Sequence, residues 1–187
     1  VAADKMNVFY IGVDNPVSIA AAGVSSNELR VSASGGGLQL NRTGTGKYNA
    51  KVTTPGEAKI TVSGGGLTPT TFDFRVKRIP DPVPQLGRSR GGTMGNGEFK
   101  AQEGVLAILE NFDFDARCNI QGYTLVYIPK REDPIESINP GARYNDKSRR
   151  LAARAKPGDS YYFNNIKARC PGDRAGRDIG TMAFQIR

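Results

Sequence analysis

The sequence contains no histidine and no tryptophan, and it has only two cysteines. The absence of histidine excludes Ser-His-Asp and Cys-His catalysis and every zinc site that needs a histidine ligand. Two cysteines are also too few for a four-cysteine zinc site. The longest apolar runs, near residues 17–24 and 105–109, are far shorter than the roughly 20 residues of a membrane-spanning helix. We therefore expect no catalytic residues, no cofactor-binding residues, no metal site and no cofactor.

Glycine, proline and positive charge are abundant instead. The 23 glycines and 11 prolines interrupt short β-branched runs, which predicts a mainly β protein. The net charge is +8 and the isoelectric point is near 9.7, so the surface attracts anionic partners. Aromatic residues do not alternate with the basic ones as they do in RNA-binding motifs, so we expect no nucleic-acid partner and no small-molecule substrate. Because the chain begins at Val1 without methionine, we expect it to be a fragment of a longer protein.

Residues 1–79 read as a series of short strands separated by turns. About seven runs alternate apolar and polar residues, such as Ala58, Ile60 and Val62, and later Phe74 and Val76. Turns recur every 8–12 residues, as in an Ig-like β-sandwich. The sequence therefore predicts an Ig-like β-sandwich over residues 1–79.

The next segment, 80–87, carries Pro80, Pro82 and Pro84 at alternate positions. Proline fixes the backbone φ angle and is unsuited to the interior of a sheet or helix. We therefore predict a proline-rich rigid linker over residues 80–87, which sets a defined angle between two domains. The alternative is a passive spacer, in which proline only stops the preceding strand.

Residues 88–187 are predicted to form a β-rich C-terminal domain of the α+β type with two short helices. The first helix is expected within "KAQEGVLAILENF", residues 100–112, and the second from Asp146 to about Ala155, where Pro157-Gly158 stops it. Strands are expected over 113–130, 160–170 and 179–187.

Two motifs resemble chemical sites but fit structural explanations better. "NRTGTGKY", residues 41–48, has the Gly-Lys pair of a phosphate-binding loop but lacks its first glycine and its final Ser or Thr, so we interpret it as a β-turn. Asp113 and Asp115 in "FDFD" fall on one face of the expected strand, where paired carboxylates could serve a glycosidase or bind calcium. The simpler interpretation is a solvated strand face.

The two cysteines, Cys118 and Cys170, fall near the ends of two expected strands. In an oxidising compartment they would form a disulfide that closes a loop of about 50 residues. Two buried thiols are the alternative.

Six basic residues crowd around a single acid, Asp146, near the second expected helix. On a helix, Lys147, Arg150 and Arg154 share a face. We interpret the group as a candidate docking patch for an acidic partner, with a solvated helix face as the alternative. Its members are Arg143, Lys147, Arg149, Arg150, Arg154 and Lys156.

Four segments, taken together and in this order, resemble the C-terminal half of the GldM/PorM family of gliding-motility and type IX secretion proteins. They are "GKYNAKVTTPGEAKITVSGGG", "FRVKRIPDPVPQLG", "GEFKAQEGVLAILENFDFDARCNIQGYTLVYIP" and "ARAKPGDSYYFNNIKARCPGD". The resemblance covers nearly the whole chain, and 74–84 and 155–173 are its most specific parts.

The resemblance implies a non-enzymatic role in the periplasm. Full-length members are anchored in the inner membrane by an N-terminal helix, absent here, which partners a small membrane protein to form a proton-driven motor. Their periplasmic part is a homodimeric rod that transmits motion and docks on a ring of periplasmic protein and lipoprotein under the outer membrane. The competing hypothesis is an extracellular Ig-like adhesin or carbohydrate-binding module, because such sandwiches also follow proline linkers there.

Overall fold

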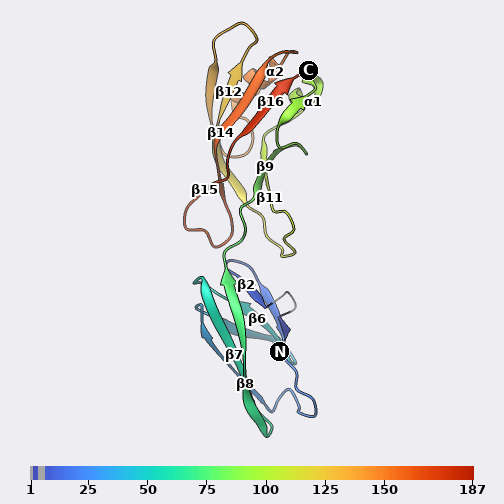
Figure 1. Cartoon of the computed structure of the whole chain (residues 1–187), viewed down its shortest axis with the longest axis vertical. Coiled ribbons are helices and arrows are strands. Elements are labelled where there is room, and N and C mark those ends of the chain that lie inside the picture. Colours follow the sequence, from blue (N-terminus) through green and yellow to red (C-terminus); the bar gives the residue numbers. More distant parts are fainter. Residues whose placement is uncertain (1, 4–6) are drawn as a thin grey trace. The chain divides into compact units, whose positions relative to one another are not determined.

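The computed structural model of the chain describes residues 2–3 and 7–187. The chain divides into two compact units (Figure 1). The first unit contains residues 1–79 and 113–116, and the second unit contains residues 80–112 and 117–187. Strands dominate both units, which confirms the prediction of a mainly β protein with two short helices.

The first unit is a sandwich of two four-stranded sheets, with strand orders β1-β3-β6-β5 and β2-β8-β7-β4. Neighbouring strands are antiparallel except for the parallel pair β2 and β8. Figure 1 shows the long hairpin of β7 and β8 in cyan to green. The strands are β1 (Ala2–Ala3), β2 (Val8–Tyr10), β3 (Asn15–Ser18), β4 (Leu29–Gly35), β5 (Gln39–Gly44), β6 (Lys47–Lys51), β7 (Gly56–Gly64) and β8 (Leu67–Lys77).

The core of the first unit follows from the period of two in its strands. In β7, Ala58, Ile60 and Val62 are buried while the residues between them are not. They meet inward-facing residues of the other sheet, such as Val17 and Ala50, in one apolar cluster. Removal of these side chains from water is the main stabilising contribution to such a sandwich.

The "NRTGTGKY" segment, residues 41–48, contains the turn between β5 and β6. Gly46 has a φ of 65°, a left-handed conformation that favours glycine. A side chain at Gly46 would also lie within 2.7 Å of the Ile19 carbonyl oxygen. The segment is therefore a hairpin turn, as its failure to match the phosphate-binding loop suggested.

The second unit has a main sheet in the order β10-β16-β14-β12-β13, with β15 paired to β14, and a separate two-stranded sheet of β9 and β11. The pair β10 and β16 is parallel and the other pairs are antiparallel. The elements are β9 (Val83–Leu86), β10 (Gly92–Met94), α1 (Asn96–Lys100), β11 (Val105–Ile108), β12 (Asn119–Ile128), β13 (Ile135–Pro140), α2 (Asp146–Ala153), β14 (Ser160–Arg169), β15 (Arg177–Asp178) and β16 (Met182–Ile186).

One face of this main sheet carries the core of the second unit. Tyr161 and Phe163 of β14 and their neighbours on β12 and β16 are buried in a single cluster. Phe99 of α1, Leu151 of α2 and Val105 of β11 belong to the same cluster, so both helices and the small sheet cover this face. Six ring pairs lie within the cluster, including Phe99 on Tyr161 with centroids 4.3 Å apart.

The helix expected within residues 100–112 is wrong. Helix α1 ends at Lys100, and residues 105–108 form strand β11, in which Val105 is buried and Leu106 is 47% exposed. The backbone of Gly104 lies very close to Ala142. A Cβ atom at position 104 would be only 2.1 Å from the Ala142 carbonyl oxygen. Pairing of residues 105–108 with β9 therefore decides their conformation, rather than the helical spacing of their apolar residues.

The long strand expected over 113–130 begins only at Asn119. Asp113 and Asp115 are exposed in the preceding loop, and the rings of Phe112 and Phe114 are half-buried. Phe114 packs edge-on against Tyr10 with ring centroids 5.0 Å apart, and residues 113–116 belong to the first unit. The two carboxylates therefore do not share a strand face, which removes the basis for pairing them.

The proline segment is only partly a linker between elements. Residues 83–86 form β9, in which Pro84 pairs with Ala107 of β11, and both Pro82 and Pro84 are buried. The expectation that proline keeps the whole segment out of sheets is therefore wrong at Pro84. The physical reason is that a two-stranded sheet consists of edge strands, where a residue without an N–H group can be accommodated.

Candidate docking surface and disulfide-bonded clamp

The described residues, 2–3 and 7–187, contain no group of three or more carboxylate or cysteine side chains that could hold a metal ion. None of the helices described is long and apolar enough to cross a membrane. The two arrangements that stand out are a cationic surface around α2 and a polar network around the disulfide.

The sequence of α2 presents its cations to solvent. The Asn145 side chain caps the helix by accepting a hydrogen bond of 2.8 Å from the Ser148 N–H. Ser148, Leu151 and Ala152 are buried against the sheet, so the positions between them point away from it. The helical prediction for 146–155 is therefore right to within the last turn, and Lys147, Arg149 and Arg150 are exposed.

Half of the six predicted docking residues pair with a nearby acid. Arg149 lies 3.7 Å from Asp146, Arg143 lies 4.0 Å from Glu103, and Arg154 lies 3.2 Å from Glu132. These pairs are exposed and contribute little to stability. Within residues 2–3 and 7–187, no carboxylate forms an ion pair with Lys147, Arg150 or Lys156.

Arg154 and Lys156 lie beyond the end of α2, where the structure adds two cations that sequence reasoning missed. Lys130 and Arg131 follow β12, and they line the same recess as Arg154 and Lys156. No spacing rule links positions 130 and 154, because the sheet and not the helix brings them together.

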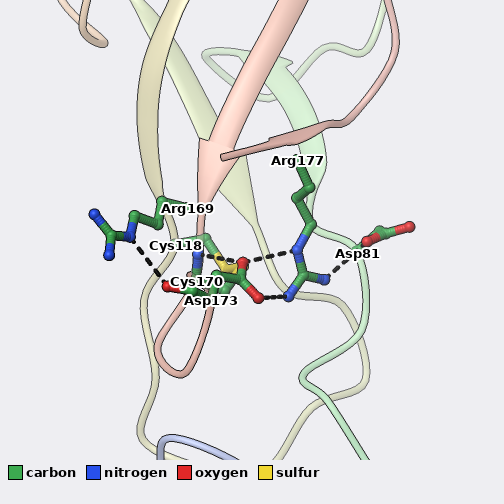
Figure 2. A network of polar contacts seen from close by, with 6 residues as sticks. All are labelled: Asp81, Cys118, Arg169, Cys170, Asp173 and Arg177. Atoms are coloured by element: carbon green, nitrogen blue, oxygen red, sulfur yellow. Dashed lines mark hydrogen bonds and ion pairs between the residues drawn. A yellow bond between two sulfur atoms is a disulfide. The ribbon is translucent and has the colours of Figure 1, made fainter. Parts of the chain in front are cut away.

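A second network surrounds the disulfide between Cys118 and Cys170 (Figure 2). The loop that follows Cys170 turns back so that the Asp173 carboxylate accepts a 2.9 Å hydrogen bond from the Cys170 N–H. Arg177 binds the same carboxylate through two nitrogens, at 2.8 and 2.6 Å. Such a bidentate pair fixes both side chains in one geometry.

Arg177 also reaches the proline segment. Its third nitrogen lies 2.8 Å from the Asp81 carboxylate, between Pro80 and Pro82 (Figure 2). The hydrogen bonds with Asp173 first and Asp81 second outweigh the effect of burial and raise the pKa of the Arg177 guanidinium. We call the disulfide, Asp173, Arg177 and Asp81 the clamp, because together they hold residue 81 against the loop that follows β14.

Two β-rich units in one chain of net charge +8 define a modular β protein. The particular family follows from the sequence of each unit. The family model of the GldM third domain matches residues 1–77, and that of the GldM C-terminal domain matches residues 80–187. The chain therefore belongs to the GldM family, whose members are components of gliding motility and type IX secretion.

Solved structures offer only remote similarity. The adhesin InvE of Yersinia pseudotuberculosis is 12% identical with a TM-score of 0.28; the match covers 96% of this chain and 57% of the adhesin chain. Domains 6–7 of the surface layer protein SbsC are also 12% identical with a TM-score of 0.28, covering 93% of this chain and 88% of theirs. These scores carry no functional argument. A comparison with curated proteins gives no match.

Proposed function

We propose that this chain is a non-enzymatic periplasmic part of the type IX secretion and gliding motor, a dimeric rod that transmits motion and docks on a ring under the outer membrane. Membership of the GldM family over both units is the observation that carries this proposal. Its partners are a second copy of the chain and the periplasmic ring proteins and lipoprotein. The inner-membrane motor partner would be reached through an N-terminal part outside these residues.

To transmit motion, the segment that connects the two units must be stiff, because a flexible segment changes its own conformation instead of passing the displacement on. Pro80 and Pro82 restrict the backbone on either side of Asp81, and Arg177 holds Asp81 by an ion pair of 2.8 Å. The clamp therefore supports the proposal that residues 80–82 are a rigid connection, in contrast to a Gly/Ser linker that behaves as a random coil.

Dimerisation is supported by an uncovered sheet face in the second unit. Ile138 of β13 is 80% exposed and Tyr162 of β14 is 39% exposed. They lie on the same face, because Ile138 is opposite Thr124 and Tyr162 is opposite Val126 on β12. The edge of β13 is partly protected, since the Asn145 amide donates to the Ile138 carbonyl. We therefore propose that two copies meet through this face rather than by pairing their edges.

The test compares linker variants with a matched control in cells that carry the full-length protein. Pro80→Gly/Pro82→Gly combined with Arg177→Ala should reduce secretion and gliding while protein level and partner binding persist. Small-angle scattering of the fragment should show a broader distribution of shapes. Pro55→Gly, at an exposed turn of the first unit, should change none of these. Normal secretion and gliding in the triple variant would contradict the mechanical role.

Docking and dimerisation have separate tests. Crosslinking in intact cells from exposed positions of α2, followed by mass spectrometry, should recover ring proteins. Light scattering of the fragment should show a dimer that Ile138→Asp converts to a monomer. A monomer at high micromolar concentration would overturn the dimer alone and leave the docking proposal standing.

A further inference from the structure

The recess beyond the ends of β12 and α2 is a cavity of about 300 Å³ in the second unit. Three separate segments line it: Tyr127 at the end of β12 with residues 129–132 that follow it, Arg154 just after α2, and Lys156, Pro157 and Asp159 before β14. Its charged groups are four cations and two carboxylates, Glu132 and Asp159. The hydrogen bonds and ion pairs that these two carboxylates already form determine which cations have no acidic partner.

Asp159 forms the base of the recess and is fully used within the chain. It is only 4% exposed, and it accepts hydrogen bonds from the Tyr127 hydroxyl at 2.9 Å, the Lys130 N–H at 3.1 Å and the Lys156 N–H at 3.0 Å. One buried carboxylate therefore fixes the backbone of both lysines at the rim. Their side chains remain outside this network.

The position of the Lys130 side chain depends on a glycine. A Cβ atom at position 158 would lie 2.9 Å from the Cδ atom of Lys130, so the aliphatic part of the lysine side chain packs over Gly158. Gly158 has a φ of 95°, which also favours glycine. The turn before β14 thus leaves room for Lys130 beside Lys156.

Arg154 shows that one wall of the recess already binds a carboxylate. Its guanidinium carbon lies 5.1 Å from the centre of the Tyr127 ring, and its nitrogen lies 3.2 Å from the carboxylate of Glu132. Both charged side chains are about half exposed. The aromatic ring restricts the guanidinium, and a restricted guanidinium binds a planar carboxylate with little further loss of freedom.

We propose that this recess binds carboxylate side chains of an acidic peptide segment of a partner protein. The inference rests on the proposed docking role and names the surface and the chemistry of its partner. Across the described residues, no carboxylate forms an ion pair with Lys130, Arg131 or Lys156, so three cations surround one arginine that already holds a carboxylate.

A peptide fits the recess better than an anionic membrane does. Pro129, Pro157 and the Tyr127 ring contribute apolar walls, which suit the aliphatic part of a glutamate and its peptide neighbours. A bilayer surface is broad, whereas this site is a recess of limited volume. Glu132 occupies the arginine in the free protein and must compete with the incoming carboxylate.

The experiment measures binding of a fluorescein-labelled hexaglutamate peptide to the whole 187-residue fragment at low ionic strength. We expect binding that hexaglutamine does not show, with amide shifts in NMR spectra concentrated at residues 127–132 and 154–159. Lys130→Gln/Lys156→Gln should weaken binding by about tenfold. The matched control, Lys147→Gln/Arg150→Gln, removes the same charge from α2 and should change binding less than about twofold.

A further variant tests the competition itself. Glu132→Gln removes the carboxylate that pairs with Arg154 and should tighten hexaglutamate binding by a few fold. Glu57→Gln, the control, removes an exposed acid elsewhere and should tighten binding less than Glu132→Gln does. Unchanged melting curves verify that each variant is folded.

Several results would overturn the proposal. Equal weakening by both lysine and control variants would show general attraction to a basic protein. Binding to phosphatidylglycerol vesicles without binding to hexaglutamate would assign the surface to a membrane, and absence of any peptide binding would remove the site. Two variants are compared in cells, Lys130→Gln/Lys156→Gln and a deletion of the whole second unit. If the deletion abolishes secretion but the lysine variant secretes normally, the recess is not a docking site and the proposed function stands. If the recess binds peptide but loss of the second unit leaves secretion unaffected, the proposed function fails instead.

Discussion

The two units reach stability by different routes. The first unit has an apolar core built mainly from aliphatic residues, in which Phe9 stacks on Phe74. The second unit combines a core rich in tyrosine and phenylalanine with a disulfide and the clamp. Alternating strands that bury one face give the first unit most of its stability, whereas the second unit, with its long loops, adds a covalent cross-link to its buried core.

The two units nevertheless share one device, a buried asparagine that holds a turn. Asn15 is 2% exposed, and its amide donates to the carbonyls of Tyr10, Val13 and Ala50. Asn139 is 1% exposed, and its amide donates to the carbonyls of Pro140, at the end of β13, and of Gly141 and Arg143 in the loop before α2. An asparagine can satisfy several backbone groups at once where no strand partner is available.

Removal of the disulfide should have the largest effect and should separate the two units most clearly. Cys118→Ser/Cys170→Ser opens a loop of 52 residues and should cost about 4 kcal/mol on the chain-entropy model. We expect calorimetry of the whole fragment to show the transition of the second unit lowered by roughly 15 to 20 °C, with the first unit unchanged. A shift of both transitions together would show that the units unfold as one, and an added reductant should not affect the variant further.

The two asparagines allow a crossed test of the same comparison. Asn15→Ala and Asn139→Ala should each cost about 2–3 kcal/mol, because buried carbonyls lose their donors. Asn15→Ala should lower only the transition of the first unit, and Asn139→Ala only that of the second. Denaturant unfolding followed by NMR signals of each unit provides the measurement, and loss of less than about 0.5 kcal/mol would mean that water replaces the amide.

Alkaline pH should distinguish the second unit through its tyrosines. Burial is the main cause that raises the pKa of Tyr123, Tyr127, Tyr144 and Tyr161, and at Tyr127 the hydrogen bond to Asp159 raises the pKa further. Because their pKa is higher in the folded state, these tyrosines contribute a stability that is complete below about pH 10, the usual tyrosine pKa. This contribution is lost as the pH rises beyond that value. We therefore expect the melting temperature of the second unit to fall steadily above about pH 10.

Tyr144 offers the matched variant for this prediction. Among the buried side-chain polar atoms of the described residues, its hydroxyl alone has no hydrogen-bond partner. Tyr144→Phe should therefore raise stability at neutral pH by up to about 1 kcal/mol and reduce the alkaline loss. The same alkaline slope in the variant and the parent protein would show that Tyr144 takes no part in it.

The smallest effect is expected on the surface of α2. Lys147→Gln/Arg150→Gln should change the stability of the second unit by less than about 0.5 kcal/mol, because both cations are exposed and unpaired within the described residues. Chemical denaturation checks this. A larger loss would mean that these cations hold the fold together and are not free for docking.

Local patterns account for much of the agreement between sequence and structure. Alternation at Ala58, Ile60 and Val62, and again at Phe74 and Val76, predicted strands where the structure contains β7 and β8. The start at Asp146 and the stop before Pro157-Gly158 predicted α2 within two residues. Both signals depend only on neighbours in the chain, which is why one sequence suffices to interpret them.

The failures involve contacts with a distant segment, and residues 113–118, expected as strand, are a loop in which Phe114 packs on Tyr10. Residues 105–108 have helical spacing, but β9 pairs with them and makes them a strand. Pro84 was expected to exclude pairing, yet it lies opposite Ala107 in an edge position. The recess of Lys130, Arg131, Arg154 and Lys156 was only half predicted, because residues 130 and 154 meet through the fold.

Sequence alone was enough to predict the mainly β class, the second helix and the family. These follow from composition, periodicity and order along the chain, which require no knowledge of contacts. The folded structure was needed to see that Arg177 binds both Asp173 and Asp81, that Asp159 accepts hydrogen bonds from the N–H groups of Lys130 and Lys156, and that residues 113–116 belong to the first unit. Such contacts join groups that lie far apart in the chain, 96 residues in the case of Arg177 and Asp81, and their energies depend on distances that only the folded chain defines.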